Sequence, residues 1–163
     1  MTPQTPSLRP PDAKDGEAVH RLIATCPPLD PNSIYCNLLQ CSHFADTSVA
    51  AELEGELLGF ISGYLIPERT DTLFIWQVAV SEKARGQGLA GKMLQHIINR
   101  PRRESVRYIE TTITESNTAS WSLFEHLAKK LSTRLDRSAM FDRKLHFADK
   151  HDSEILVRIG PLK

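Results

Sequence analysis

The segment of residues 76–91 is the feature that most narrowly limits what this chain can fold into. An apolar, β-branched run over residues 72–80 is followed by a loop that holds Gly86, Gly88 and Gly91, and then by the apolar positions of a helix. Glycines allow consecutive backbone N–H groups to approach one anion, and the N-terminus of the following helix adds about half a positive charge. This order of strand, loop and helix predicts a binding site for a phosphate group.

A dinucleotide-binding loop is the first alternative, because the three glycines also match the pattern G-x-G-x-x-G. In that fold the first glycine follows its strand almost directly, whereas residues 81–85 separate Val80 from Gly86 here. Little more than seventy residues follow Gly91, too few for a second mononucleotide-binding half. The spacing therefore argues against a nicotinamide or flavin site. The second alternative is a tight turn without a ligand, with Arg85 as a solvated surface charge.

Hydrophobic periodicity along the rest of the chain predicts alternating strands and helices. Helices are expected after Asp12, after Asn32 or Ser33, over residues 89–98 and from Asn117 to about residue 131. Strands are expected over residues 48–53, 57–65, 72–80, 108–114, 135–141 and 154–159, with a hairpin turn at Glu54 and Gly55. The predicted order, with a first strand near Leu8, is β-α-α-β-β-β-α-β-α-β-β, which indicates an α/β layered domain around a mixed sheet.

Chain length and charge balance limit the number of domains and the class of partner. A chain of 163 residues suits one domain, so we expect residues 1–7 to form a flexible tail and residues 8–163 to form a single domain. Lysine plus arginine equals aspartate plus glutamate at 20 each, so no net charge draws the chain to nucleic acid or to an anionic membrane. Small-molecule chemistry is therefore expected.

Cysteine usage and the distribution of apolar residues indicate a cytoplasmic protein. Cys26, Cys36 and Cys41 form an odd set without a CxxC pair, and the first residues do not have the pattern of a signal segment. No apolar run approaches the roughly 20 residues that span a bilayer. These features predict a reducing compartment and no role within a membrane.

The loop resembles the signature of the GNAT superfamily of N-acetyltransferases. The pyrophosphate-binding pattern Q/R-x-x-G-x-G/A has its counterpart in residues 85–90, at the family's distance from its central strand. The resemblance implies a GNAT-like mixed, mostly antiparallel sheet flanked by helices on both faces. Its parallel central strands, residues 76–80 and 108–114, are expected to splay apart and admit the pantetheine arm of acetyl-CoA. The resemblance also implies direct acetyl transfer to an amine, with acetyl-CoA as the co-substrate.

The same resemblance implies which residues hold the coenzyme. The backbone N–H of Val78 is expected to stabilise the oxyanion of the tetrahedral transition state. Asn117 lies where the helix start of the family touches the cofactor, but it is also a favourable N-cap, and both roles remain open. The expected cofactor-binding residues are Val78, Ala79, Val80, Arg85, Gly86, Gln87, Gly88, Leu89, Ala90, Asn117 and Ser120. The tyrosine that often serves as general acid in the family is replaced by Phe124, which cannot protonate a thiolate.

Three further segments resemble the diaminobutyrate acetyltransferases of ectoine biosynthesis. They are residues 29–39, 71–80 and 157–161, within a resemblance that runs from about residue 8 to residue 161. It implies acetylation of 2,4-diaminobutyrate at its terminal (N4) amine, and a homodimer. The expected substrate-binding residues are Asp30, Asn32, Ser33, Tyr35 and Trp76. A carboxylate, amide and hydroxyl groups and an aromatic wall suit a diamino acid. Residues 30–33 are also typical of a turn and helix cap, and the two aromatic residues are also compatible with a core.

A base is expected near the substrate, because a protonated alkylamine must lose a proton before it attacks a thioester. His151 and Glu154, at the start of the last predicted strand, are the favoured candidates, and Glu110 is the second choice. Cysteine nucleophiles are not expected, since none of the three thiols is predicted to lie beside the glycine loop. No metal is expected, because no histidine and carboxylate group has zinc-ligand spacing. The alternative functions are acetylation of another small amine and an acyl-CoA-binding sensor without turnover.

Overall fold

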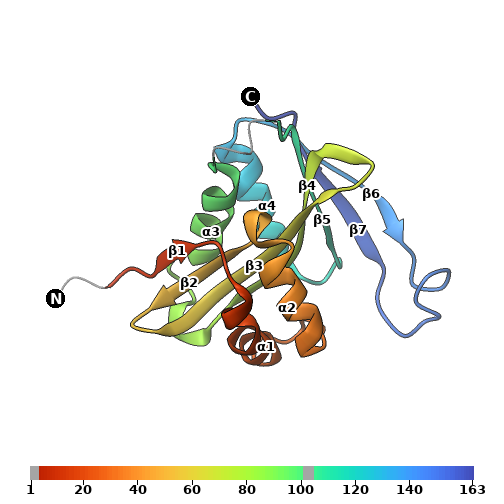
Figure 1. The fold of residues 1–163 in the computed structure, drawn as a ribbon. Coiled ribbons are helices and arrows are strands. Elements are labelled where there is room, and N and C mark those ends of the chain that lie inside the picture. Colours follow the sequence, from red (N-terminus) through yellow and green to blue (C-terminus); the bar gives the residue numbers. More distant parts are fainter. Residues whose placement is uncertain (1–3, 101–104) are drawn as a thin grey trace. The chain divides into compact units, whose positions relative to one another are not determined.

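The computed structural model describes residues 4–100 and 105–163, and the elements there occur in the predicted order (Figure 1). The α-helices are α1 (Gly16–Ala24), α2 (Ile34–Ser42), α3 (Leu89–Ile98) and α4 (Thr118–Lys130). The strands are β1 (Ser7–Arg9), β2 (Val49–Leu53), β3 (Glu56–Ile66), β4 (Arg69–Val80), β5 (Tyr108–Ile113), β6 (Leu135–Phe141) and β7 (Glu154–Ile159). Most predicted boundaries are therefore correct to within a few residues.

The chain divides into two compact units. Unit 1 comprises Met1–Tyr64 and Ile75–Arg103, and unit 2 comprises Leu65–Phe74 and Glu104–Lys163, so that β4 contributes to both. The strand order is β1-β2-β3-β4-β5-β7-β6. Strands β4 and β5 pair in parallel, whereas β1 with β2, β2 with β3, β5 with β7 and β6 with β7 pair antiparallel. This confirms the predicted mixed, mostly antiparallel sheet. The single domain over residues 8–163 and the splaying of its central strands stay predictions.

The ordered N-terminal part is longer than the sequence indicated. Ser7 belongs to β1, where it pairs with Glu52 of β2, and its hydroxyl donates to the Glu52 carbonyl at 3.2 Å. The prediction that residues 1–7 form a flexible tail is therefore wrong for Ser7, and residues 1–3 lie outside the described residues. A short edge strand such as β1 pairs through backbone groups, which do not depend on the type of side chain. Three residues are also too few to show a repeat of apolar positions in the sequence.

The helices of unit 1 cover both faces of its strands. One face carries Phe60 of β3 and Ala79 of β4, which pack in a buried cluster with apolar residues of α1 and α2. Gly59, the neighbour of Phe60, lies against α3 on the other face. A Cβ atom on Gly59 would lie only 2.9 Å from Cε of Met93 in α3. Neighbouring residues of a strand point to opposite faces. The pair α1 and α2 and the helix α3 therefore lie on opposite sides of β3.

Unit 2 holds the parallel pairing and the C-terminal hairpin. Thr72, Leu73 and Phe74 of β4 pair with residues 108–110 of β5. Strand β7 then pairs with β5 on one side and with β6 on the other, so β6 forms an exposed edge. Helix α4 buries an apolar stripe that consists of Trp121, Phe124, Leu127 and Ala128.

Gly160, which follows β7, gives a stability prediction. Its φ angle is +147°, and a Cβ atom there would lie 2.6 Å from Cδ1 of Tyr108 and 2.7 Å from the carbonyl oxygen of Arg107. Gly160→Ala is expected to lower the free energy of unfolding by about 2 kcal/mol, because the backbone is strained and a carbonyl has to move. Urea denaturation monitored by circular dichroism measures this change.

The matched control for Gly160→Ala is Gly91→Ala in α3. Within residues 4–100 and 105–163, no heavy atom lies within 4 Å of a Cβ atom built on Gly91. Alanine is favoured over glycine by about 0.5–1 kcal/mol within a helix, so this variant should be as stable as the parent or more so. Equal unfolding midpoints for the two variants would show that Gly160 is not under the constraint described.

Candidate active site

The glycine loop between β4 and α3 has an open backbone surface in unit 1. Gly86 and Gly88 have φ angles of +77° and +72°, and no heavy atom of the described residues lies within 4 Å of a Cβ atom built on either glycine. Glycine is therefore required here by the backbone conformation and not by crowding. Gly88 is the N-cap residue of α3 and has no side chain that could accept from the first N–H groups of the helix. Such a helix start suits an anion.

Arg85 fastens the loop to the end of β4. Its Nε donates to the carbonyl of Val80 at 3.2 Å, and its Nη2 lies 3.9 Å from Sγ of Cys26. The Cys26 thiol also lies 3.5 Å from the Val80 carbonyl. The prediction that no thiol lies beside the loop is wrong for Cys26, because the chain that follows α1 returns to the end of β4.

Strand β4 alternates between a buried and a more exposed face within unit 1. Ile75, Gln77 and Ala79 are buried, whereas Val78 is half-buried and Trp76 is 40% exposed. The Trp76 ring lies edge-on to that of Tyr64, with 6.1 Å between the centroids. The alternative that Trp76 is a core residue is therefore not supported, since a large part of the indole is available for contact.

Gln77 holds the segment that precedes α2 against β4. Its side-chain oxygen accepts from Nδ2 of Asn32 at 2.8 Å, and its Nε2 donates to the carbonyl of Asp30 at 2.9 Å. Its backbone N–H donates to the Ser62 hydroxyl at 3.1 Å. Sequence reasoning did not assign a role to Gln77. The signal available in the sequence is a long polar side chain at a position of an apolar strand that faces the core. The amide of such a side chain needs hydrogen-bond partners.

Of the other predicted substrate residues, Ser33 caps a helix, and Asp30 and Tyr35 are exposed. The Ser33 hydroxyl accepts from the backbone N–H of Cys36 at 3.1 Å and is the N-cap of α2. Tyr35 is 67% exposed, which excludes the core alternative, and Asp30 is exposed as well. Asn32 and Ser33 therefore have structural roles, and Asp30, Tyr35 and Trp76 are the exposed members of the predicted set.

His151 and Glu154 lie together in unit 2. Nε2 of His151 is 4.0 Å from Oε1 of Glu154, and both side chains are partly buried. Nδ1 of His151 lies 2.6 Å from the carbonyl of Asp152, and Phe147 stacks on the imidazole with 4.5 Å between ring centroids. A carbonyl only accepts, so Nδ1 of His151 donates to it and Nε2 faces the carboxylate. The carboxylate of Glu154 can accept a proton from a substrate.

Glu110, the second candidate base, is committed to an ion-pair network in unit 2. Its carboxylate is buried and accepts from Arg69 at 2.6 and 3.0 Å, and from Arg158. Burial alone would raise the pKa of Glu110, but the hydrogen bonds and charges of the two arginines bring this pKa below its usual value. A carboxylate held by two guanidinium groups is a weak base, so the structure argues against this choice.

The start of α4 supports the cap role of Asn117. The Asn117 side chain accepts from the backbone N–H of Ser120 at 3.2 Å, and the indole of Trp121 donates to the Thr114 carbonyl at 3.0 Å. Phe124 is 2% exposed and belongs to the buried stripe of the helix. The aromatic ring that replaces the family's tyrosine therefore serves packing.

Two thiols are poor nucleophiles because of burial. Burial raises the pKa of Cys36, and it raises the pKa of Cys41 to about 12, together with the charges of Asp15 and Asp12. Over residues 4–100 and 105–163, no group of three or more histidine, cysteine, aspartate or glutamate side chains is placed to hold a metal ion. In the same ranges, no helix combines the length and the apolar character needed to cross a bilayer.

Residues 17–128 match the model of the acetyltransferase (GNAT) family. The chain belongs to the GNAT family. The matched range contains the glycine loop, the start of α4 and all five predicted substrate-binding residues, so the resemblance of residues 85–90 to the family signature is confirmed.

Two relatives of this GNAT protein have the same name. The chain is 61% identical to L-2,4-diaminobutyric acid acetyltransferase of Methylotuvimicrobium alcaliphilum over 96% of this chain and 91% of that protein. It is 51% identical to the protein of the same name from Vibrio parahaemolyticus over 96% and 86% of the two chains. Among solved structures, it is similar to diaminobutyrate acetyltransferase EctA from Paenibacillus lautus, in complex with its substrate L-2,4-diaminobutyric acid and coenzyme A. The TM-score between the two structures is 0.92. Their sequences are 40% identical over 97% of this chain and 96% of that chain.

Proposed function

We propose that this GNAT enzyme transfers the acetyl group of acetyl-CoA to the terminal (N4) amine of L-2,4-diaminobutyrate. The identity of 61% to a relative named for this substrate carries the proposal. It is supported by the likeness to a structure that contains both the diamino acid and coenzyme A. The reaction is proposed as a step of ectoine biosynthesis in the cytoplasm, catalysed by a homodimer.

The glycine loop is proposed to bind the diphosphate of the coenzyme. Gly86 and Gly88 present their backbone without side chains, and the uncapped start of α3 supplies N–H donors and the positive end of the helix dipole. Arg85 keeps the loop fixed to Val80, the last residue of β4. The backbone N–H of Val78 on this strand is assigned to the oxyanion, which it stabilises by a hydrogen bond that strengthens as negative charge develops.

Glu154 is proposed as the base, with His151 as its partner. Glu154 accepts the proton of the ammonium, and Nε2 of His151 lies 4.0 Å from its carboxylate, a distance that one water bridges for onward transfer of the proton. The neutral amine then forms the C–N bond while the C–S bond of the thioester breaks, and the acylated nitrogen releases its second proton to water. The sulfur leaves as a thiolate, which takes a proton from water, because Phe124 has no proton to give and a thiol with a pKa near 8.5 is a fair leaving group.

Asp30, Tyr35 and Trp76 are proposed to bind the diamino acid. Asp30 pairs with the ammonium that does not react, Tyr35 offers a hydroxyl to the carboxylate, and Trp76 provides an aromatic wall. Asn32 and Ser33 act through the backbone, because both side chains are engaged in holding the segment before α2. An acidic site for the distal α-ammonium favours reaction at the terminal amine.

Acetyl transfer with a panel of amines tests the proposal. Purified protein is incubated with acetyl-CoA and L-2,4-diaminobutyrate, free thiol is followed with a chromogenic disulfide, and the product is assigned by NMR. We expect rapid thiol release and acetylation at N4. Faster release with a polyamine, an aminoglycoside or a peptide N-terminus would reject the substrate. Binding of acetyl-CoA without product from any amine would favour a sensor.

A positioning role for Gln77 gives a kinetic prediction. Gln77→Leu removes the amide that holds Asn32 and the Asp30 carbonyl. We expect the KM for diaminobutyrate to rise about tenfold with kcat changed less than about threefold, because hydrogen bonds worth about 1 kcal/mol each are lost away from the reacting atoms. Initial-rate kinetics at saturating acetyl-CoA measure both constants.

A double-variant cycle separates this role from general loosening of the fold. Asn32→Ala should raise the same KM, and Asn32→Ala combined with Gln77→Leu should raise it little beyond Gln77→Leu alone, since both remove one contact. Additive effects, or a fall in kcat that dominates, would contradict the positioning role.

A further inference from the structure

The segment between β6 and β7 in unit 2 contains one partly buried residue. Over residues 142–150 every residue is exposed except Phe147. The ring of Phe147 packs on the imidazole of His151, with 4.5 Å between the centroids and 33° between the ring planes. An exposed segment does not need to cover a ring for its own folding, because single apolar side chains are common on protein surfaces. The contact with His151, the partner of the proposed base, therefore indicates a specific role for this ring.

Hydrogen bonds within the segment hold Phe147 in a defined place. The carboxylate of Asp142 accepts from two backbone N–H groups of the turn that follows it, each at 2.9 Å. The backbone N–H of Arg143 donates to the Ser153 hydroxyl at 2.9 Å, which joins the start of the segment to the residue before β7. The carbonyl of Phe147 itself accepts from the N–H of Lys150 at 2.9 Å. The segment is therefore a compact support for the ring.

A β-bulge in β6 adds a second aromatic ring to this group. The pairing of β6 with β7 shifts before Phe141, so that this residue, and not Met140, pairs with Glu154. A bulge of this kind re-aims a side chain, and residues that are directly paired in antiparallel strands lie on one face of the sheet. Phe141 also lies edge-on to Phe147, with 6.3 Å between the ring centroids. The bulge therefore puts a ring that contacts Phe147 on the same face as the proposed base.

We propose that Phe147 is a positioning residue for the proton transfer assigned to Glu154 and His151. Nδ1 of His151 donates to the carbonyl of Asp152 at 2.6 Å, and a hydrogen bond by itself permits the ring to rotate about its axis. Packing of Phe147 against one face of the imidazole opposes this rotation. The ring then keeps Nε2 at 4.0 Å from Oε1 of Glu154, where one water completes the path of the proton.

This inference rests on the proposed function, because it assumes that Glu154 is the base and His151 its partner. It adds a residue that acts on the rate of proton transfer through the imidazole. The alternative is that Phe147 only anchors the segment of residues 142–150. Loss of the ring would then affect the enzyme in the same way whether or not an imidazole is present at position 151.

Steady-state kinetics of Phe147→Leu test the positioning role. Leucine keeps an apolar side chain but has no flat face to lie on an imidazole. We expect kcat for diaminobutyrate to fall about fivefold and its KM to change less than about twofold, because a misplaced proton acceptor slows the reaction without weakening substrate binding. Phe147→Tyr keeps the ring and should retain kcat to within about twofold. Leu145→Ala changes a side chain of the same segment that is 84% exposed, and it should leave kcat unchanged.

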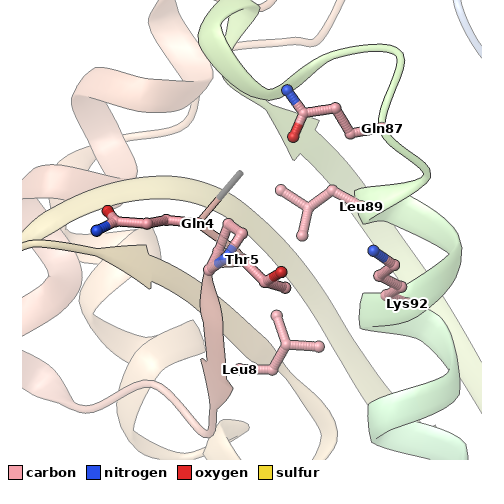
Figure 2. A pocket seen from close by; sticks show the side chains of 7 residues that line it. Gln4, Thr5, Leu8, Gln87, Leu89 and Lys92 are labelled. Atoms are coloured by element: carbon pink, nitrogen blue, oxygen red, sulfur yellow. The ribbon is translucent and has the colours of Figure 1, made fainter. Parts of the chain in front are cut away.

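The KM for acetyl-CoA gives a further control. The glycine loop proposed for the coenzyme belongs to unit 1, where Gln87 and Leu89 line a hollow together with residues of the N-terminal segment (Figure 2). Neither Phe147 nor His151 lines this hollow. Phe147→Leu should therefore leave the KM for acetyl-CoA unchanged. A rise in this KM that accompanies the fall in kcat would indicate general loosening of the fold and would contradict the positioning role.

A double-variant cycle tests whether Phe147 acts through His151. Phe147→Leu combined with His151→Asn should have the kcat of His151→Asn alone, since a residue that only positions an imidazole has no effect once the imidazole is absent. Proton NMR gives a readout that does not depend on activity. The ring current of Phe147 should displace the Cε1–H resonance of His151 in the parent and in Phe147→Tyr, and this displacement should be lost in Phe147→Leu. The spectrum of His151→Asn assigns the resonance.

The outcomes separate this inference from the proposed function. If the parent acetylates diaminobutyrate and His151→Asn lowers kcat, but Phe147→Leu does not, the inference alone is wrong. Additive losses of kcat in the double variant, or a His151 resonance that stays in place in Phe147→Leu, would also overturn it. If His151→Asn has the parental kcat, the role of His151 as partner of the base fails, and the inference fails with it. If the parent acetylates no amine, the proposed function itself is wrong.

Discussion

Glu154→Gln is expected to lower kcat for diaminobutyrate by about 10²–10⁴-fold, the usual contribution of a positioned general base. Glutamine has nearly the same shape as glutamate but cannot take the ammonium proton. The distance from Glu154 to Nε2 of His151 is 4.0 Å, so His151 remains as a weaker acceptor and some activity should survive. The KM for acetyl-CoA should change little, because the base is not assigned to the coenzyme.

The pH dependence identifies the lost group as a base. An alkylamine has a pKa around 10, so raising the pH supplies neutral amine from solution. The rate of Glu154→Gln should therefore rise steeply with pH toward this value, whereas the parent enzyme should level off at lower pH. Stopped-flow single-turnover rates measured from pH 6 to 10 give this comparison without interference from product release.

Two variants accompany this experiment. His151→Asn should lower kcat less than Glu154→Gln does, because the carboxylate remains. Glu17→Gln removes an exposed carboxylate that pairs with Arg21 on α1, and it should leave kcat unchanged. Parallel pH profiles of Glu154→Gln and the parent enzyme, with kcat within threefold, would show that another group or water takes the proton.

The sequence predicted those parts of the fold that depend on local pattern. Apolar residues repeat along the chain with the period of a strand or helix, and this repeat located the α-helices and the strands from β2 to β7 in order. The glycine loop was recognisable because its expected role depends on adjacent residues only. Gly86 and Gly88 adopt positive φ angles, and a helix follows them directly in the sequence.

Side-chain partners far apart in the sequence were not predictable. Gln77 binds Asn32, 45 residues away, and Cys26 approaches Arg85, 59 residues away. Glu110 is a candidate base from the sequence because it lies in a predicted strand, but its partner Arg158 lies 48 residues further along the chain. A local pattern gives the face on which a polar residue lies. The pattern does not show which charged side chains the fold places beside that residue.

Glu110→Gln is expected to lower the free energy of unfolding by about 3 kcal/mol at pH 7. This is the lower end of the range for breaking a buried ion pair, because Arg69 and Arg158 remain partly exposed and can be hydrated. Glutamine keeps the shape of the side chain but not the charge that balances the two guanidinium groups. Since these contacts join β4, β5 and β7, the loss should appear as a lower urea midpoint without loss of secondary structure.

The pH dependence of this difference follows from the direction of the pKa shift. The pKa of Glu110 in the folded protein lies below its ordinary value. Its contribution is therefore fully present above the ordinary pKa and is lost as the pH falls through the folded value. The gap between parent and variant should persist at pH 5 and shrink below about pH 4. Glu125→Gln, which breaks an exposed pair with Arg137, should cost less than about 1 kcal/mol at every pH. A gap that is independent of pH would mean that Glu110 contributes through its shape and not through its charge.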